Sequence, residues 1–366
     1  MLDIFKRVLT FFRRQRIQTD SFVFRLHHSA TVALLLIFCL IVGLNQYVRS
    51  PINCSTETIP RAVLDAHCWS QSTFTVPEEF QKKTGSGFTY PGVATPEGKG
   101  SRRTKFYYPW VFLSLFFQAI LFYIPGWLWK NWEGGKLQAL RMDLNIGFVS
   151  KEEKAQKKEM LVDYLHENMN NHTWWACRYL FCEVLAFINI IGQIFFMDHF
   201  LGGEFWSYGS RVLSFMASDD EGREDPMTYV FPKTVKCTFH NIGASGTLVR
   251  YDSLCVLPLN ALNGKIYTFL WFWLIVLLIF TSVWFIFTIS IITSSKFRIY
   301  VLRKRFGHID HGVLAQIDRR CGIGDWFLFC MLGENLDSRI FRDVMEHLVD
   351  IIGKRNGSMM QLTEHL

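Results

Sequence analysis

The chain has 366 residues, of which 50% are hydrophobic and 16% aromatic, and its formal net charge at pH 7 is +7. A chain of this length could hold about two or three soluble domains, but its apolar residues lie in long continuous blocks, which an ordinary soluble fold does not have. The sequence also lacks the motifs of phosphate binding, of serine- and zinc-dependent hydrolysis and of acyl transfer. We therefore predict no enzyme, no catalytic residue and no cofactor.

Residues 1–28 form the first predicted element, an amphipathic cytoplasmic helix. Apolar residues recur there at helical spacing, and basic residues occupy the rest of the helical wheel. The apolar positions are Leu2, Phe5, Val8, Leu9 and Phe12. Such a helix can lie on the inner membrane surface or fold into the mouth of a pore, and the pattern alone leaves both alternatives open. No small-residue cleavage site follows the first apolar block, so we expect this segment to be retained.

Four apolar blocks are long enough to cross a bilayer, which takes about 20 helical residues. The predicted spans are residues 29–47, 109–129, 178–199 and 266–292. The fourth block contains no charged residue, whereas the third contains Glu183. Four polar residues of the third block (Arg178, Cys182, Asn189 and Gln193) fall on one helix face. That face either bonds to other helices or faces a wet cavity, and Glu183 lies off it and needs its own partner.

Basic residues give the orientation of the spans. They are concentrated before the first span and after the fourth: Lys6, Arg7, Arg13, Arg14, Arg16 and Arg25, then Lys296, Arg298, Arg303, Lys304 and Arg305. Because such residues favour the cytoplasmic side, both termini are predicted to be cytoplasmic. The net positive charge is mostly this asymmetry and requires no nucleic-acid partner. The second span gives no orientation, since Arg102, Arg103 and Lys105 precede it and basic residues also follow it.

This topology makes residues 48–108 and 200–265 extracellular loops, and residues 130–177 and 293–366 a cytoplasmic loop and tail. In chain order, the loops and tail contain a possible short helix at 61–68, an irregular stretch at 84–100, a helical pattern at 151–165, a β-compatible run at 227–231 and a helical pattern at 340–352. The fold class predicted is an all-α membrane protein: four transmembrane helices, a small disulfide-tied extracellular domain and a helical cytoplasmic domain.

Four of the nine cysteines lie in the predicted extracellular loops: Cys54, Cys68, Cys237 and Cys255. Two cysteines in each loop, in an oxidising compartment, indicate disulfides. Three connectivities are possible, and the count does not choose among them. The close pairs typical of a zinc site are missing, so we predict no metal.

Several motifs resemble those of the innexin family. Tyr107-Tyr108-Pro109-Trp110-Val111 is similar to the innexin signature YYQWV, with Pro109 in place of Gln. Other innexin-like segments follow in collinear order along nearly the whole chain: Val23-Phe24-Arg25, Ile59-Pro60, Asp65, Cys68-Trp69, Trp132-Glu133-Gly134-Gly135-Lys136, Lys236-Cys237, Leu257-Pro258-Leu259-Asn260 and Gly324-Asp325-Trp326-Phe327. His67 and Gly264 depart from the family pattern, which usually has Tyr and Glu there.

The resemblance implies a homomeric or heteromeric ring of eight subunits in the plasma membrane, whose pore passes ions and small metabolites. A second ring on an adjacent cell would dock with it to form a gap junction. The first span and the N-terminal helix would line the pore, with the first-loop helix at the outer constriction. Candidate pore-lining residues are therefore Leu2, Asp3, Phe5, Arg61 and Asp65.

We also expect Cys54 to pair with Cys255, and Cys68 with Cys237, because Cys54 and Cys255 each lie at the membrane-proximal end of a loop. Two alternative functions stay open: an undocked hemichannel that releases small solutes, and a non-conducting four-span adhesion protein.

Overall fold

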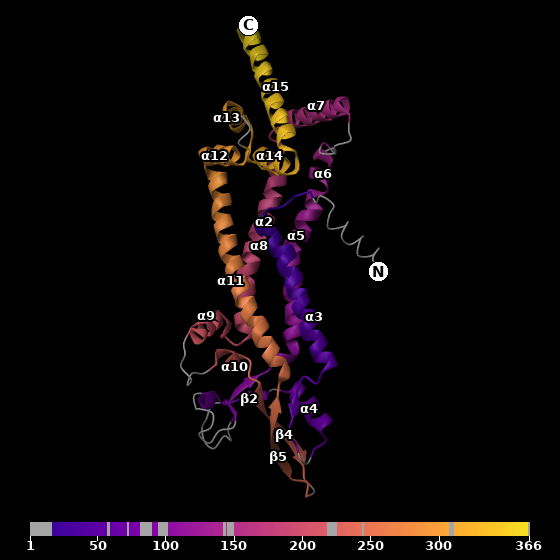
Figure 1. Ribbon diagram of the computed structural model, residues 1–366, viewed down its shortest axis with the longest axis vertical. Helices are drawn as coiled ribbons and strands as arrows, with labels where there is room; N and C mark the ends of the chain where they lie inside the picture. The colour runs from indigo at the N-terminus through magenta and orange to yellow at the C-terminus, as the bar shows by residue number, and fades with distance from the viewer. Residues whose placement is uncertain are drawn as a thin grey trace. The chain divides into compact units, whose positions relative to one another are not determined.

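The computed structural model describes residues 17–56, 59–71, 73–80, 90–93, 102–141, 144, 150–217, 225–243, 245–306 and 311–364. The chain divides into two compact units. The terminal unit comprises Met1–His28, Ile124–Ala186 and Phe280–Leu366, and the sheet unit comprises Ser29–Tyr123 and Phe187–Ile279 (Figure 1). Predicted pore residues Leu2, Asp3 and Phe5 lie outside the described residues.

Four helical segments among the described residues are long and apolar enough to cross a membrane: Phe22–Val48, Tyr108–Glu133, Thr173–Phe200 and Pro258–Thr293. The first consists of α2 (Phe22–Arg25), the π-helical turn η1 (Leu26–Thr31) and α3 (Val32–Val48). The second consists of the 3-10 turn η3 (Tyr108–Trp110) and α5 (Val111–Glu133), and the others are α8 (Thr173–Phe200) and α11 (Pro258–Thr293). Each predicted span lies within one of these segments.

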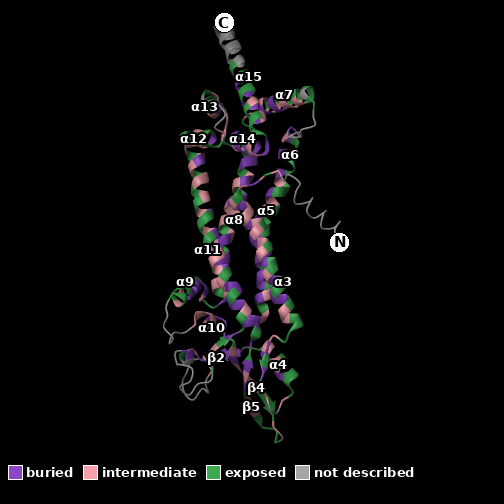
Figure 2. Cartoon of the chain, viewed as in Figure 1, coloured by how far each residue is buried: buried purple, intermediate pink, exposed green. Residues whose placement is uncertain are grey.

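These helices keep large apolar surfaces exposed (Figure 2). In α3, the side chains of Ile37, Leu40 and Leu44 are 54%, 64% and 62% exposed. Exposed apolar area on this scale indicates a surface covered by lipid or by another subunit. The four helices and the disulfides described below confirm the predicted fold class.

The terminal unit has its core around α14 (Ile323–Asn335). Leu328, Phe329 and Leu332 of this helix are at most 1% exposed. They belong to one apolar cluster with residues of α7 (Lys151–Glu167) and α15 (Ser338–Glu364). The remaining helices of this unit are α6 (Lys136–Arg141), α12 (Ser295–Arg305) and α13 (His311–Arg320). The helical patterns predicted at 151–165 and 340–352 are thus confirmed.

A buried polar cluster fixes the start of α14 against the start of α8. Asp325 accepts hydrogen bonds from His172 Nδ1 at 2.7 Å and from the backbone N–H of Asn170 at 2.7 Å. A Cβ on Gly324 would lie only 2.4 Å from the backbone nitrogen of Thr173. Glycine is therefore needed at 324, because any side chain would separate the two helices.

The sheet unit contains a five-stranded antiparallel sheet with the order β1-β5-β4-β2-β3. Its strands are β1 (Asn53–Cys54), β2 (Thr73–Thr75), β3 (Arg103–Lys105), β4 (Thr234–Ile242) and β5 (Leu248–Val256). Its helices besides the long ones are α4 (Arg61–Ser70), η2 (Pro77–Phe80), α9 (Phe205–Met216) and α10 (Pro226–Val230). The sheet together with α4 is the small disulfide-tied domain that the sequence predicted.

One local prediction was wrong. The run 227–231, interpreted as β-compatible, lies largely in helix α10. The Asp225 side chain accepts a hydrogen bond from the backbone N–H of Met227, and Pro226 occupies the first turn. An aspartate cap followed by proline is a helix-start signal, and it outweighs the β-propensity of this short run. The predicted helix at 61–68 is present as α4, whereas most of the irregular stretch 84–100 lies outside the described residues.

Two glycines of the sheet unit lead to opposite predictions. The nearest atoms to a Cβ on Gly264, inside α11, would be 3.8 Å away, whereas a Cβ on Gly209 would lie 2.1 Å from the Trp271 ring. Gly264→Ala should therefore stabilise the protein by about 0.5–1 kcal/mol, the usual helix preference for alanine over glycine. Gly209→Ala should lower the thermal unfolding midpoint of the purified protein. A rise for both variants, or a fall for both, would contradict these packing distances.

Candidate functional site

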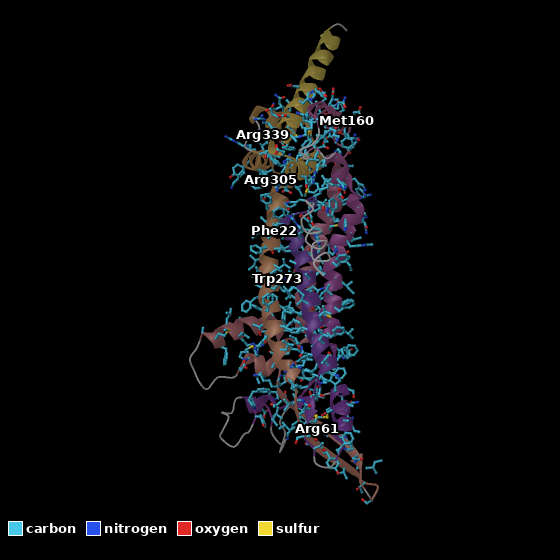
Figure 3. All side chains as sticks on the ribbon, turned by 45° about the vertical axis from the view of Figure 1, so that its right-hand side comes forward. Phe22, Arg61, Met160, Trp273, Arg305 and Arg339 are labelled. Carbon is cyan, nitrogen blue, oxygen red and sulfur yellow. A yellow bond between two sulfur atoms is a disulfide. The ribbon has the colours of Figure 1, made fainter. Side chains whose placement is uncertain are left out.

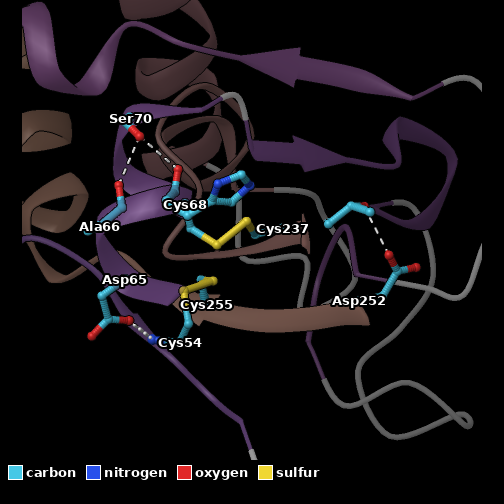
Figure 4. The surroundings of a disulfide bond; sticks show 10 residues. Cys54, Asp65, Ala66, Cys68, Ser70, Cys237, Asp252 and Cys255 are labelled. Carbon is cyan, nitrogen blue, oxygen red and sulfur yellow. Dashed lines mark hydrogen bonds between the residues drawn. A yellow bond between two sulfur atoms is a disulfide. The ribbon is translucent and has the colours of Figure 1, made fainter. Parts of the chain in front are cut away.

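Two buried disulfides tie the sheet and α4 together. Cys54–Cys255 joins β1 to β5 across 201 residues, and Cys68–Cys237 joins α4 to β4 across 169 residues (Figure 4). This is the pairing predicted above. The sulfur atoms of Cys54, Cys68 and Cys255 lie within 4.8 Å of one another, and all are oxidised in the bridges, which leaves no thiolate for a metal. Each bridge is worth about 2–5 kcal/mol in a domain of this kind.

Helix α4 has one buried and one exposed face. Leu64 and Cys68, one helical turn apart, are at most 1% exposed and pack in the cluster around the disulfides. His67 packs edge-on against Phe239 of β4, with ring centroids 4.9 Å apart. Val63 points away from that face and is exposed, and Arg61, in the first turn of the helix, is exposed as well. This alternation explains why the segment folds as an amphipathic helix and which face it offers to other molecules.

The structure separates the two pore candidates of α4. Asp65 is half-buried, and its Oδ1 accepts a hydrogen bond from the backbone N–H of Cys54 at 2.8 Å (Figure 4). Arg61 lies one helical turn earlier, at the start of α4, and is exposed (Figure 3). Asp65 thus holds β1 against α4, whereas Arg61 is available to solvent. The sequence gave no sign that Asp65 holds β1, because the Asp65 acceptor and the Cys54 donor are eleven residues apart.

The family motif packs where the sheet meets α5. Tyr108 and Val111 are at most 4% exposed, whereas Trp110 is 49% exposed. The hydroxyl of Tyr107 donates to the carbonyl of Val230 at 2.5 Å, and burial raises the pKa of Tyr107 well above its usual value. Pro109 lies in the first turn of η3, where a missing N–H costs little. The motif residues are therefore mainly structural.

Lys105 is a buried cation that the sequence analysis counted only as a basic residue beside the second span. It is 8% exposed, and its Nζ donates to the carbonyls of Tyr229 at 2.5 Å and Val230 at 2.8 Å. Burial, together with the nearby Arg103, lowers the pKa of Lys105 to about 7. Arg103 itself pairs with Glu204 at 3.0 Å. These contacts join β3 to α10 and to the residue preceding α9.

Some polar residues of the third apolar helix have hydrogen-bond partners in the structure. Glu183, which needed its own partner, accepts hydrogen bonds from Trp284 Nε1 at 2.9 Å and from Ser21 Oγ at 3.3 Å. Gln193 donates to Asn189 at 3.2 Å along the same helix. Part of the predicted polar stripe is therefore satisfied within α8 itself.

Comparison with known proteins decides the family. The Innexin family model matches residues 20–352. This chain belongs to the innexin family. It is 49% identical over 355 residues to "Innexin shaking-B" of Drosophila melanogaster, covering 96% of this chain and 95% of that protein. It is 46% identical over 349 residues to "Innexin inx2" of Drosophila melanogaster, covering 95% of this chain and 95% of that protein. It is 44% identical over 349 residues to "Innexin inx2" of Schistocerca americana, covering 95% of this chain and 97% of that protein.

Innexins form gap-junction channels and are multi-pass proteins of the plasma membrane. The four long apolar helices of this innexin are therefore its membrane spans. The family's members are channel proteins, in agreement with a sequence that carries no enzyme motif.

The buried lysine makes the stability of this innexin depend on pH. In the unfolded chain lysine keeps its usual pKa of about 10.4, whereas Lys105 in the folded chain has a pKa of about 7. Between pH 7 and pH 9 the unfolded state binds more protons, so the free energy of unfolding should rise by about 2 kcal/mol from this residue. Thermal unfolding midpoints at pH 7, 8 and 9, with free thiols blocked, measure the slope.

Lys105→Met should remove most of that slope. Lys233→Met is the matched control, because Lys233 is exposed and should leave the slope unchanged. If Lys105→Met keeps the wild-type slope, the ammonium of Lys105 is not the group that titrates.

Proposed function

We propose that this innexin is one subunit of an eight-membered channel ring that passes ions and small metabolites between adjacent cells. Two such rings dock through their disulfide-bonded regions. The observation that carries the proposal is the family match over residues 20–352, which contains all four spans and both disulfides. An undocked hemichannel and an adhesion protein are the outcomes from which the experiment must distinguish it.

The cysteines support an orientation with the disulfide-bonded region outside the cell. Disulfides persist in oxidising compartments, and thiols stay reduced in the cytosol. The five free cysteines lie in the spans or in the terminal unit: Cys39, Cys177, Cys182, Cys321 and Cys330. Together with the basic residues that flank the first and fourth spans, this supports cytoplasmic termini.

Dye transfer between cells tests the proposal. In pairs of cells that both express the protein, one cell is loaded with a small fluorescent dye. Single expressing cells are bathed in the same dye. Transfer between paired cells, with no uptake by single cells, is the expected result. Dye uptake by single cells without transfer between paired cells would indicate a hemichannel. If the protein reaches the cell surface but the dye neither enters single cells nor passes between paired cells, an adhesion protein is indicated. Pairs in which only one cell expresses the protein are the control.

Arg61 gives a test of the outer constriction. If α4 surrounds the outer mouth, one exposed arginine per subunit becomes a ring of like charges, and such rings set ion preference. Arg61→Glu should raise the cation-to-anion permeability ratio by at least about fivefold, since a single charge about 4 Å from an ion in water is worth about 1 kcal/mol and the variant changes two charges. Reversal potentials in asymmetric salt measure the ratio.

Arg339→Glu, an exposed site in the terminal unit, is the control and should leave the ratio unchanged. Asp65→Lys is unsuitable as a pure charge test, because it also breaks the hydrogen bond to Cys54. An unchanged ratio in Arg61→Glu channels that reach the membrane would exclude α4 from the pore.

The N-terminal segment gives a second test of the pore. Single cysteines at Leu2, Asp3 or Phe5 should react with small charged thiol reagents, and the current should fall by more than half as the pore is obstructed. Because Cys177 is exposed, the experiment is done in a Cys177→Ser background. Reagent-insensitive currents in all three variants, or normal conductance after deletion of residues 2–10, would place this segment away from the pore.

A further inference from the structure

The terminal unit contains a cavity at some distance in sequence from the disulfide cysteines. Its volume is about 310 Å³, and it lies among α2, α8, α11, α12 and α14. Phe22 and Arg305, labelled in Figure 3, are among its lining residues. Its apolar wall includes Trp284, Phe287 and Phe327. Ligand pockets in proteins have volumes of roughly 300–1,000 Å³ and mostly apolar walls with a few polar groups, and this cavity fits that description.

One wall of the cavity presents a buried carboxylate without a cation. Glu183 is 7% exposed, and its Oε1 accepts hydrogen bonds from two neutral groups, Trp284 Nε1 and Ser21 Oγ. Among the residues that the structure describes, no arginine, lysine or histidine forms an ion pair with Glu183. Acidic groups at membrane depth are costly unless they are paired, so this position favours a cationic partner.

A second wall presents a donor without an acceptor. Trp326 is 9% exposed and lines the cavity, and its Nε1 has no hydrogen-bond partner within the described part of the chain. A buried N–H that lacks an acceptor costs about 1–3 kcal/mol. This group therefore favours a ligand that carries an oxygen.

The other charged groups of the cavity are already paired. Arg25 pairs with Asp20 at 3.4 Å, and Arg305 forms an ion pair with Glu334. Asp20 also accepts from His28 at 2.6 Å. Among the described residues of the cavity wall, Glu183 is thus the carboxylate without a cation. The Trp326 N–H and the Nε of Arg25, which is ion-paired but not hydrogen-bonded, are the donors without an acceptor.

We propose that this cavity binds an amphiphilic amino alcohol. Its ammonium group pairs with Glu183, its hydroxyl oxygen accepts from Trp326 Nε1, and its hydrocarbon body packs against Phe287 and Phe327. An anionic amphiphile would meet a like charge at Glu183, and a simple alcohol would leave that carboxylate without a cation. The site does not depend on the proposed intercellular function, since it lies within a single subunit.

Binding of 2-amino-1-octanol to the purified full-length protein tests the site. Affinity is measured by native mass spectrometry in detergent, with 1-octanol and octanoate for comparison. Glu183→Gln, which keeps an acceptor for Trp284 and Ser21, should weaken 2-amino-1-octanol at least about tenfold, because hydrogen bonds to charged groups are worth about 1.5–3 kcal/mol. The affinity for 1-octanol should change much less. Glu152→Gln, at an exposed carboxylate, is the matched control.

Steric variants test the cavity without touching its charges. Thr288→Phe places a ring in the space and should abolish binding, whereas Ile286→Phe, at a 64% exposed position of the same helix, should bind as the wild type does. Trp326→Phe should weaken 2-amino-1-octanol more than octylamine, which has no hydroxyl. If Glu183→Gln does not fold, Thr288→Phe and Trp326→Phe still decide the outcome.

Two results would overturn the proposal. One is equal binding by wild type, Glu183→Gln and Thr288→Phe, which would show partition into the detergent shell only. The other is a photocrosslink from a benzophenone amino acid at Thr288 to residues 1–16, which would show that the N-terminal segment of the chain itself occupies the cavity.

Discussion

The sheet unit depends on two covalent links between segments that are remote in sequence. Strands β1 and β2 contain only two and three residues, too few to be stable as strands by themselves. Strands β4 and β5 form a long hairpin that supplies most of the sheet. The short strands form because Cys54 is bonded to β5 and Cys68 to β4 of that hairpin. Asp65 adds a hydrogen bond to the same junction. Removal of the Cys54–Cys255 bridge would free β1 from the hairpin, and removal of the Cys68–Cys237 bridge would free α4 with its exposed Arg61.

The terminal unit is organised by a different constraint, a fully buried polar cluster. His172 and Asp325 are at most 3% exposed, and their hydrogen bond joins the segment before α8 to the first turn of α14. Such a pair is stable at depth because its members satisfy one another, whereas Glu183 in the same unit has only neutral partners. The His172–Asp325 pair therefore stabilises the fold by itself, whereas the Glu183 carboxylate is the group that we propose pairs with a ligand.

The spans, the disulfide cysteines and the amphipathic helices were predictable because each is encoded by residues close together in sequence or by composition. Helix α4, for example, follows from Leu64 and Cys68 one turn apart. The β4–β5 hairpin was not predicted, because its inward residues alternate clearly only near Val235 and Cys237 and the rest of β4 is largely exposed. The roles of Asp65, Lys105 and Trp326 were not predictable either. Each depends on a contact, or the lack of one, with a residue remote in sequence.

Both disulfides close loops of about half the chain, and this constrains how the protein is made. Cys237 is synthesised 169 residues after Cys68, and Cys255 201 residues after Cys54. At translation rates of about 5–20 residues per second, the first loop waits roughly 8–40 s for its partners. In the orientation proposed above, Cys54 and Cys68 spend that time in an oxidising lumen, each with the other as the second cysteine of its loop. Maturation therefore requires either that this premature pair be suppressed or that thiol–disulfide exchange rearrange it once the third span has been inserted.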